Sequence, residues 1–186
     1  MSGGSLLASD ELADPNNIPG SSSDLAFDDL DDASAIRSLI RKYPSRTVDN
    51  YILNVAASTP QVNTALTIGP LIYGQGQGPV NQRSVQLPSL AKATLSRGRG
   101  LQIGKALNRW SIIHICDLGE LFVSLVEAAL NGQPSEQVWN SDGIYVAGVG
   151  ETVCTLHLQS RALLIGIVIH TSVASYCPGC RQQELD

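Results

Sequence analysis

The stretch VNTALTIGP, residues 62–70, decides the fold class of this 186-residue chain. Its β-branched and apolar residues are typical of a buried strand, and Gly69-Pro70 then ends the strand and passes the chain to a loop. Helical patterns flank this strand, over residues 47–58 before it and residues 85–97 after it. Strands that alternate with helices predict an α/β fold in which the long strands pair in parallel.

Two helices are expected before this strand. Asp32 is a good N-cap residue for the first helix, which Tyr43-Pro44 ends. The second helix covers residues 47–58 and ends at Thr59-Pro60. The residues that recur at helical spacing, and that we expect to be buried, are Ile36, Leu39, Ile40, Val48, Ile52 and Val55.

The second half of the chain continues the alternation. A helix over residues 85–97 is expected to end at Gly98, and short strands are expected at 101–104 and 110–115, with a last strand at 144–147. The clearest helix begins at Asp117, which with Glu120 resembles a capping box. Its apolar stripe is typical of core packing. The stripe consists of Leu118, Leu121, Phe122, Leu125, Val126, Ala129 and Leu130.

Composition excludes several classes of protein. Hydrophobic residues make up 43% and charged residues 16% of the chain, which indicates a globular domain. A net charge of −5 offers no basic surface for nucleic acid. The longest apolar run, residues 162–169, falls short of the roughly 20 residues that span a bilayer, so no membrane partner is expected. The polar start, residues 1–19, and the sparse cysteines favour a reducing, cytoplasmic setting.

Three local patterns carry weaker alternatives. Cys177 and Cys180 have the spacing of a redox motif but lack a strand-helix context. No metal site is expected, because His157 and His170 have no spacing typical of zinc ligands. The glycine-rich loop at residues 74–79 lacks the G-x-G-x-x-G spacing of a phosphate-binding turn.

Three segments carry a family resemblance. GPLIYG at residues 69–74 resembles the R-P-x-x-(V/I)-Y-G segment of extended short-chain dehydrogenases/reductases, with Gly69 in place of arginine. WSIIHICDL at 110–118 resembles their (F/W)-x-x-(V/I)-H-V-x-D-L segment, and YVAGVGE at 145–151 resembles the strand and turn that follow. From Ser2 to Glu151 the chain therefore resembles the NAD-dependent epimerase/dehydratase family, in particular fungal-type nucleoside-diphosphate-sugar epimerases and aldehyde reductases.

The resemblance implies a fold and its limits. Such proteins bind NAD or NADP on a Rossmann domain and the substrate on a smaller C-terminal lobe. The expected fold is a partial Rossmann-like parallel sheet with a remnant of the substrate lobe, divided into an irregular segment (1–29), the Rossmann part and lobe (30–151) and a divergent apolar tail (152–186). The family's G-x-x-G-x-x-G does not occur, which predicts an N-terminally truncated family member. The tail suggests a retained intron or a shifted frame.

The resemblance also implies a catalytic site. The family uses Tyr-x-x-x-Lys with a serine or threonine from the end of its fifth strand. Tyr43 lies near the expected place, with Arg46 one position earlier than the lysine, and Ser5, or alternatively Ser2, would supply the hydroxyl. Pro70 is the cofactor-binding candidate. The structural alternative for Tyr43 is a surface tyrosine before a helix-stopping proline.

His114 and Asp117 have a structural interpretation, since His114 can be hydrogen-bonded at a strand end while Asp117 caps a helix. A catalytic histidine is the alternative.

Two functions follow. One is an NAD(P)-dependent oxidoreductase or epimerase that acts on a small-molecule aldehyde, ketone or nucleotide-sugar. The other is a non-catalytic remnant or pseudoenzyme with at most a protein-binding role, homo-oligomerisation included. We expect the chain alone not to bind NAD(P)H measurably, because backbone amides that hold a pyrophosphate come from a glycine turn that this sequence lacks.

Overall fold

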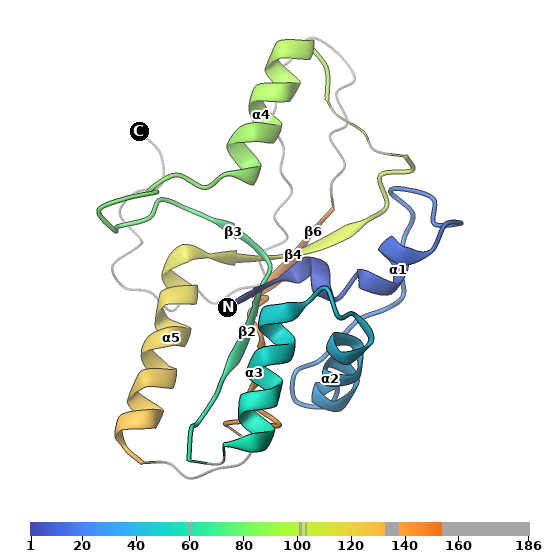
Figure 1. The fold of residues 1–186 in the computed structure, drawn as a ribbon. Coiled ribbons are helices and arrows are strands. Elements are labelled where there is room, and N and C mark those ends of the chain that lie inside the picture. The colour runs from blue at the N-terminus through green and yellow to red at the C-terminus, as the bar shows by residue number, and fades with distance from the viewer. Residues whose placement is uncertain (60, 101, 103, 133–137, 154–186) are drawn as a thin grey trace. The chain divides into compact units, whose positions relative to one another are not determined.

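A computed structural model describes residues 1–59, 61–100, 102, 104–132 and 138–153. Leu101, Ile103 and all but the first two residues of the tail at 152–186 lie outside the described residues, and with them Cys177, Cys180 and the apolar run at 162–169. The chain divides into two compact units (Figure 1). The first contains Met1–Asn17, Asp24–Pro70 and Leu125–Ala147, and the second contains Ile18–Ser23, Leu71–Ser124 and the chain from Gly148 onward.

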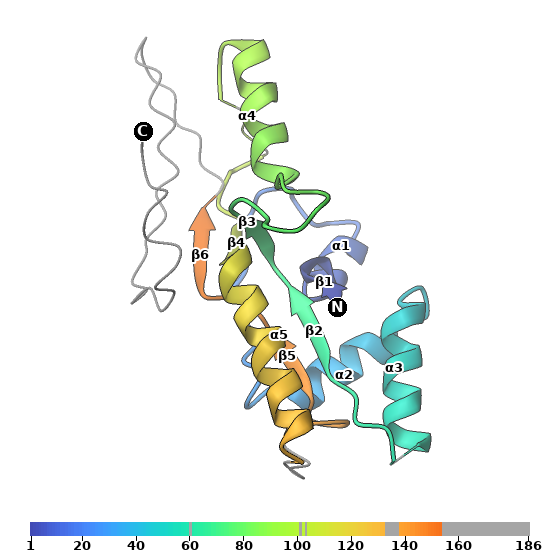
Figure 2. The ribbon, with the colours of Figure 1, turned by 90° about the vertical axis from the view of Figure 1, so that its left-hand side faces the viewer.

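The first unit is built on a parallel sheet with the strand order β1-β2-β5. These strands are β1 (Ser2–Gly3), β2 (Leu66–Gly69) and β5 (Ile144–Val146), and β2 lies beside β5 in Figure 2. All four residues of β2 are buried, as expected for a strand with neighbours on both edges. The predicted strand at residues 62–70 is therefore confirmed but is shorter at its start.

Four helical elements belong to this unit: the 3-10 turn η1 (Gly4–Leu6), α1 (Ser9–Ala13), α2 (Ala33–Lys42) and α3 (Thr47–Ser58). The two predicted helices are confirmed as α2 and α3, and α3 has the predicted bounds. Asp32 is the N-cap residue of α2, as predicted, but its carboxylate does not cap the helix, because it accepts the backbone N–H of Asp28 at 2.9 Å instead of an N–H of α2.

One core fills this unit. Its members come from η1, α2, α3 and the sheet: Leu6, Ile36, Leu39, Ile40, Leu53, Leu66, Ile68 and Ile144. The prediction for α2 is confirmed, but that for α3 is wrong at Val48, which is 64% exposed. In α3, Asp49 and Leu53 are the buried residues, since these two positions one turn apart form the inner face of the helix.

The second unit contains a three-stranded sheet in the order β3-β4-β6. Its strands are β3 (Leu71–Tyr73), β4 (Arg109–His114) and β6 (Gly150–Val153). β3 and β4 pair in parallel, whereas β4 and β6 pair antiparallel, which the alternation of elements does not predict. The helix α4 (Gln86–Arg97) ends at Gly98 in the left-handed conformation, as predicted.

The helix α5 (Ile115–Leu130) follows β4 directly. Its start makes the predicted N-cap wrong, because Asp117 lies inside the first turn. Instead, the Nδ1 atom of His114 accepts the backbone N–H of Cys116 at 3.3 Å, so His114 is hydrogen-bonded at the strand end as predicted. Of the predicted core stripe only Leu118 is buried, and Phe122, Val126 and Leu130 are exposed.

The chain thus combines helices with one small parallel sheet and one small mixed sheet, which is compatible with an α/β fold. None of the helices in the described residues is long and apolar enough to cross a membrane.

Candidate functional site

The predicted site residues Ser5 and Pro70 lie just beyond neighbouring parallel strands. Ser5 is in η1, which follows β1, and Pro70 follows β2. The two connections approach closely, since a Cβ added to Gly4 would lie 3.1 Å from the carbonyl oxygen of Gly69 and 3.6 Å from the Cα of Pro70. The carboxyl ends of parallel strands are where α/β folds build their sites, so this edge is the candidate site.

Arg46 joins this edge from the connection between α2 and α3. Its Nη2 atom donates a hydrogen bond of 3.0 Å to the hydroxyl oxygen of Ser5. The connection is held by its own backbone, because the N–H of Arg46 donates to the carbonyl of Tyr43 at 3.0 Å. The side-chain amide of Asn50 donates to the carbonyls of Ile40, Tyr43 and Arg46 at 3.0–3.2 Å. The structure therefore brings two of the three predicted catalytic side chains together, Ser5 from η1 and Arg46 from the turn between α2 and α3.

The hydroxyl of Tyr43 has a different partner. It donates to the carboxylate oxygen Oδ1 of Asp10 at 2.5 Å, and the Nζ of Lys42 lies 2.8 Å from the same oxygen. Lys42 and then Tyr43 stabilise this carboxylate, which lowers the pKa of Asp10. The hydrogen bond to Asp10 raises the pKa of Tyr43 above its usual 10.0. The phenol in this contact therefore gives up its proton less readily than a free tyrosine does.

Sequence reasoning missed two carboxylates at this site. Asp10 carries no pattern that points to Tyr43, which is 33 positions away. Asp49 is only 5% exposed and accepts a hydrogen bond of 2.9 Å from the hydroxyl of Ser2, the alternative catalytic hydroxyl. An acidic residue in the first turn of a helix is usually explained by the helix dipole, so no sequence pattern predicts this burial.

The fit of a nicotinamide cofactor can be tested on these residues. In the described residues the guanidinium of Arg46 bonds Ser5 through Nη2, and its other nitrogens are donors suited to ribose hydroxyls. The glycine-rich loop of the second unit is a poorer candidate for phosphate, because the N–H of Gly76 already donates to the carbonyl of Gln82 at 2.9 Å. Among the described residues no glycine turn has the spacing that holds a pyrophosphate.

His114 is packed rather than presented to a ligand. Its ring lies edge-on to Tyr73, with the ring centroids 5.2 Å apart. Gly74 has a φ of +97°, and a Cβ added there would overlap the imidazole. These contacts support the structural interpretation of His114. Among the residues that the structure describes, no group of three or more His, Cys, Asp or Glu side chains is arranged to hold a metal ion.

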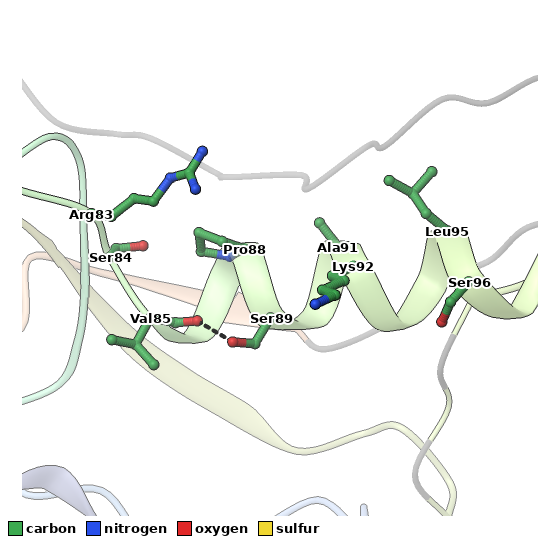
Figure 3. Close-up of a pocket in the computed structure, with 9 residues that line it drawn as sticks. All are labelled: Arg83, Ser84, Val85, Pro88, Ser89, Ala91, Lys92, Leu95 and Ser96. Atoms are coloured by element: carbon green, nitrogen blue, oxygen red, sulfur yellow. Dashed lines mark hydrogen bonds between the residues drawn. The ribbon is translucent and has the colours of Figure 1, made fainter.

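A groove of about 830 Å³ follows one face of α4 (Figure 3). Arg83 and Lys92 supply positive charge and Leu95 an apolar wall. The hydroxyl of Ser89 is turned back onto the carbonyl of Val85 at 2.6 Å. None of the predicted site residues lines this groove.

Comparisons with known proteins find one distant relative. The chain is similar to the oxidase ucsJ of an Acremonium species, with 32% identity over 141 residues that cover 72% of this chain. The matched part spans only 40% of that oxidase. No protein-family model matches the sequence, and no solved structure matches it.

Proposed function

We propose that this chain is part of an NAD(P)-dependent oxidoreductase of the extended short-chain dehydrogenase/reductase type, with a partial Rossmann-like sheet in its first unit. Its substrate would be the carbonyl group of an aldehyde, a ketone or a nucleotide-sugar. The three motif segments in order, the parallel strands and the similarity to a protein named an oxidase support this proposal.

The contact between Arg46 and Ser5 is the observation that carries the proposal. A guanidinium has only donors, so the oxygen of Ser5 must accept in this contact. The O–H of Ser5 is thereby left to donate elsewhere, and at the carboxyl ends of β1 and β2 a substrate carbonyl oxygen is a suitable acceptor. Arg46 also places positive charge beside the oxygen on which negative charge develops during reduction.

Tyr43 would act as the proton donor in this scheme. Its hydroxyl, which donates to Asp10 in this structure, must turn to the substrate oxygen to protonate it. Bound NAD(P)H would supply the hydride. Arg46 stands in for the family's lysine. The glycines that would hold the pyrophosphate do not occur in these 186 residues.

The test is reduction of carbonyl substrates by the protein expressed from the longest open reading frame that contains this sequence. Oxidation of NADPH or NADH is followed by absorbance with a panel of aldehydes, ketones and nucleotide-sugars. We expect Arg46→Ala and Ser5→Ala each to lower kcat about 10- to 100-fold. Turnover that both variants leave unchanged would refute the assignment of this site.

A second candidate, a non-catalytic family member, is favoured by the contact between Tyr43 and Asp10. There the phenol is bound to a carboxylate, and Lys42 precedes the tyrosine instead of following it. In that case no panel substrate is reduced, and Arg46→Ala changes only the unfolding temperature. Binding of NADPH to the longer protein used in the activity assay, measured by fluorescence titration, separates the two further, since a pseudoenzyme without a pyrophosphate turn gives no saturable signal.

A further inference from the structure

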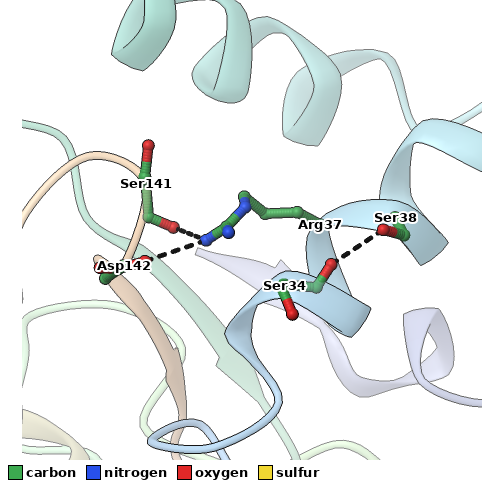
Figure 4. Close-up of polar contacts among 5 residues, drawn as sticks. All are labelled: Ser34, Arg37, Ser38, Ser141 and Asp142. Atoms are coloured by element: carbon green, nitrogen blue, oxygen red, sulfur yellow. Dashed lines mark hydrogen bonds and ion pairs between the residues drawn. The ribbon is translucent and has the colours of Figure 1, made fainter.

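A groove of about 550 Å³ lies between α2 and α3 in the first unit. α2 contributes two arginines and two serines spaced one turn apart, while α3 contributes an apolar floor. Figure 4 shows Arg37 reaching from α2 toward Ser141 at the rim. The groove is lined by Ser34, Arg37, Ser38, Arg41, Leu53, Ala56, Ala57 and Ser141.

The charge of α2 is unbalanced within the helix. It carries three cations, Arg37, Arg41 and Lys42, and no acidic residue. Lys42 is paired with Asp10 at 2.8 Å, and Arg37 with Asp142 at 3.1 Å.

Arg41 differs from the other two cations. Its Nη1 donates to the backbone and side-chain oxygens of Asn50 at 3.3 and 3.2 Å and to the side-chain oxygen of Asn54 at 2.7 Å. These oxygens are neutral, so in the described part of the chain no carboxylate balances the charge of Arg41.

The two arginines that line the groove are one turn apart on the same face. Asp142 already pairs with Arg37, so an anion bound between the two side chains would balance the charge of Arg41. In the described residues each guanidinium makes its hydrogen bonds through Nη1, which leaves donors on Nε and Nη2. Each guanidinium presents its remaining N–H donors in one plane, an arrangement that matches the oxygens of a phosphoryl group.

We propose that this groove binds a phosphate monoester. Arg41, with Arg37 beside it, holds the phosphoryl oxygens, and the organic part lies on the apolar floor formed by Leu53, Ala56 and Ala57. Asp142 occupies one side of Arg37 and disfavours a more highly charged ligand. The site is independent of the carbonyl chemistry proposed for Ser5 and Arg46.

The test is a titration of the full 186-residue chain with phenyl phosphate, followed by NMR of the arginine Nε–Hε signals. Arg37→Gln and Arg41→Gln assign the two signals. We expect the Arg41 signal to move with phenyl phosphate and Arg41→Gln to weaken binding about tenfold. Arg97→Gln, which removes an exposed arginine at the end of α4, is the matched control and should change binding by less than about twofold.

Two further measurements keep the outcome decisive. Ala57→Leu fills the groove at an exposed helix position and should weaken phenyl phosphate more than inorganic phosphate. Arg41→Lys keeps the positive charge but removes the paired N–H donors of the guanidinium. It serves as the second variant if Arg41→Gln fails to fold. Binding that Arg97→Gln weakens as much as Arg41→Gln, or benzoate binding as tightly as phenyl phosphate, would overturn the proposal.

Discussion

The helices α2 and α5 both carry apolar residues at helical spacing, but only α2 buries them. In α2, Ile36 and Ile40 are fully buried and Leu39 is 8% exposed. In α5, Val126 is 57% exposed and Leu130 is 80% exposed. Periodicity tells which face of a helix is apolar, but burial of that face requires a second layer that the helix itself does not encode.

The two helices differ in what the described chain places against them. Around α2 lie η1, α3 and the strands β2 and β5, whose side chains close one core. For α5, only Leu118 near its start is buried. The apolar pattern of α5 therefore predicts a helix correctly and a buried face incorrectly.

The difference in burial between α2 and α5 is tested most strongly by truncating one apolar residue in each helix. Ile36→Ala should lower the free energy of unfolding by about 3 kcal/mol, because it removes buried methylene groups and leaves a cavity. Val126→Ala should change it by less than about 0.5 kcal/mol, because that side chain is largely exposed. Urea unfolding of both variants measures the difference. Equal losses would mean that the face of α5 is covered in solution.

Two glycines extend the comparison to backbone positions. Gly74→Ala should destabilise the protein by about 2 kcal/mol, because an alanine at φ +97° is strained and its Cβ overlaps His114. Gly119→Ala in α5 should stabilise it by roughly 0.5–1 kcal/mol, since an added Cβ meets nothing within 4 Å and alanine favours a helix. Thermal unfolding distinguishes the signs of the two effects. Destabilisation by Gly119→Ala would show a close neighbour on that face of α5.

The sequence predicted the positions of helices and strands better than their burial and pairing. The bounds of α3 and the stop of α4 at Gly98 follow from local signals, namely Pro60 beyond the first and a left-handed glycine at the second. The exposure of Val48 and the antiparallel pairing of β4 with β6 depend on residues far along the chain, which no local pattern contains.

The candidate site shows the same limit. The family pattern placed Ser5 and Arg46 on the same site, and the structure joins them at 3.0 Å. The family pattern does not include Asp10. Asp10 contacts Tyr43 only because α1 lies beside the end of α2 in the fold. A contact between two residues that are tens of positions apart in the sequence can be identified only when the fold is known.

The smallest expected effect concerns this exposed cluster of Asp10, Lys42 and Tyr43. The pKa of Asp10 is lowered by Lys42 and Tyr43, so its contribution to stability is complete above its unfolded value of 3.8 and is lost as the pH falls through the folded pKa. The pKa of Tyr43 is raised by Asp10, so the matching contribution is complete below 10.0 and is lost as the pH rises through the folded pKa.

Asp10→Asn should therefore lower the midpoint of the Tyr43 phenol titration. The titration is followed by ultraviolet difference absorbance, with Tyr43→Phe to assign the signal. Because the cluster is solvent-exposed, the variant should leave the unfolding midpoint at neutral pH nearly unchanged, in contrast to Ile36→Ala in the core. A phenol midpoint that does not move in Asp10→Asn would show that the contact between Tyr43 and Asp10 is not maintained in solution and would leave the tyrosine hydroxyl available to a substrate without rearrangement.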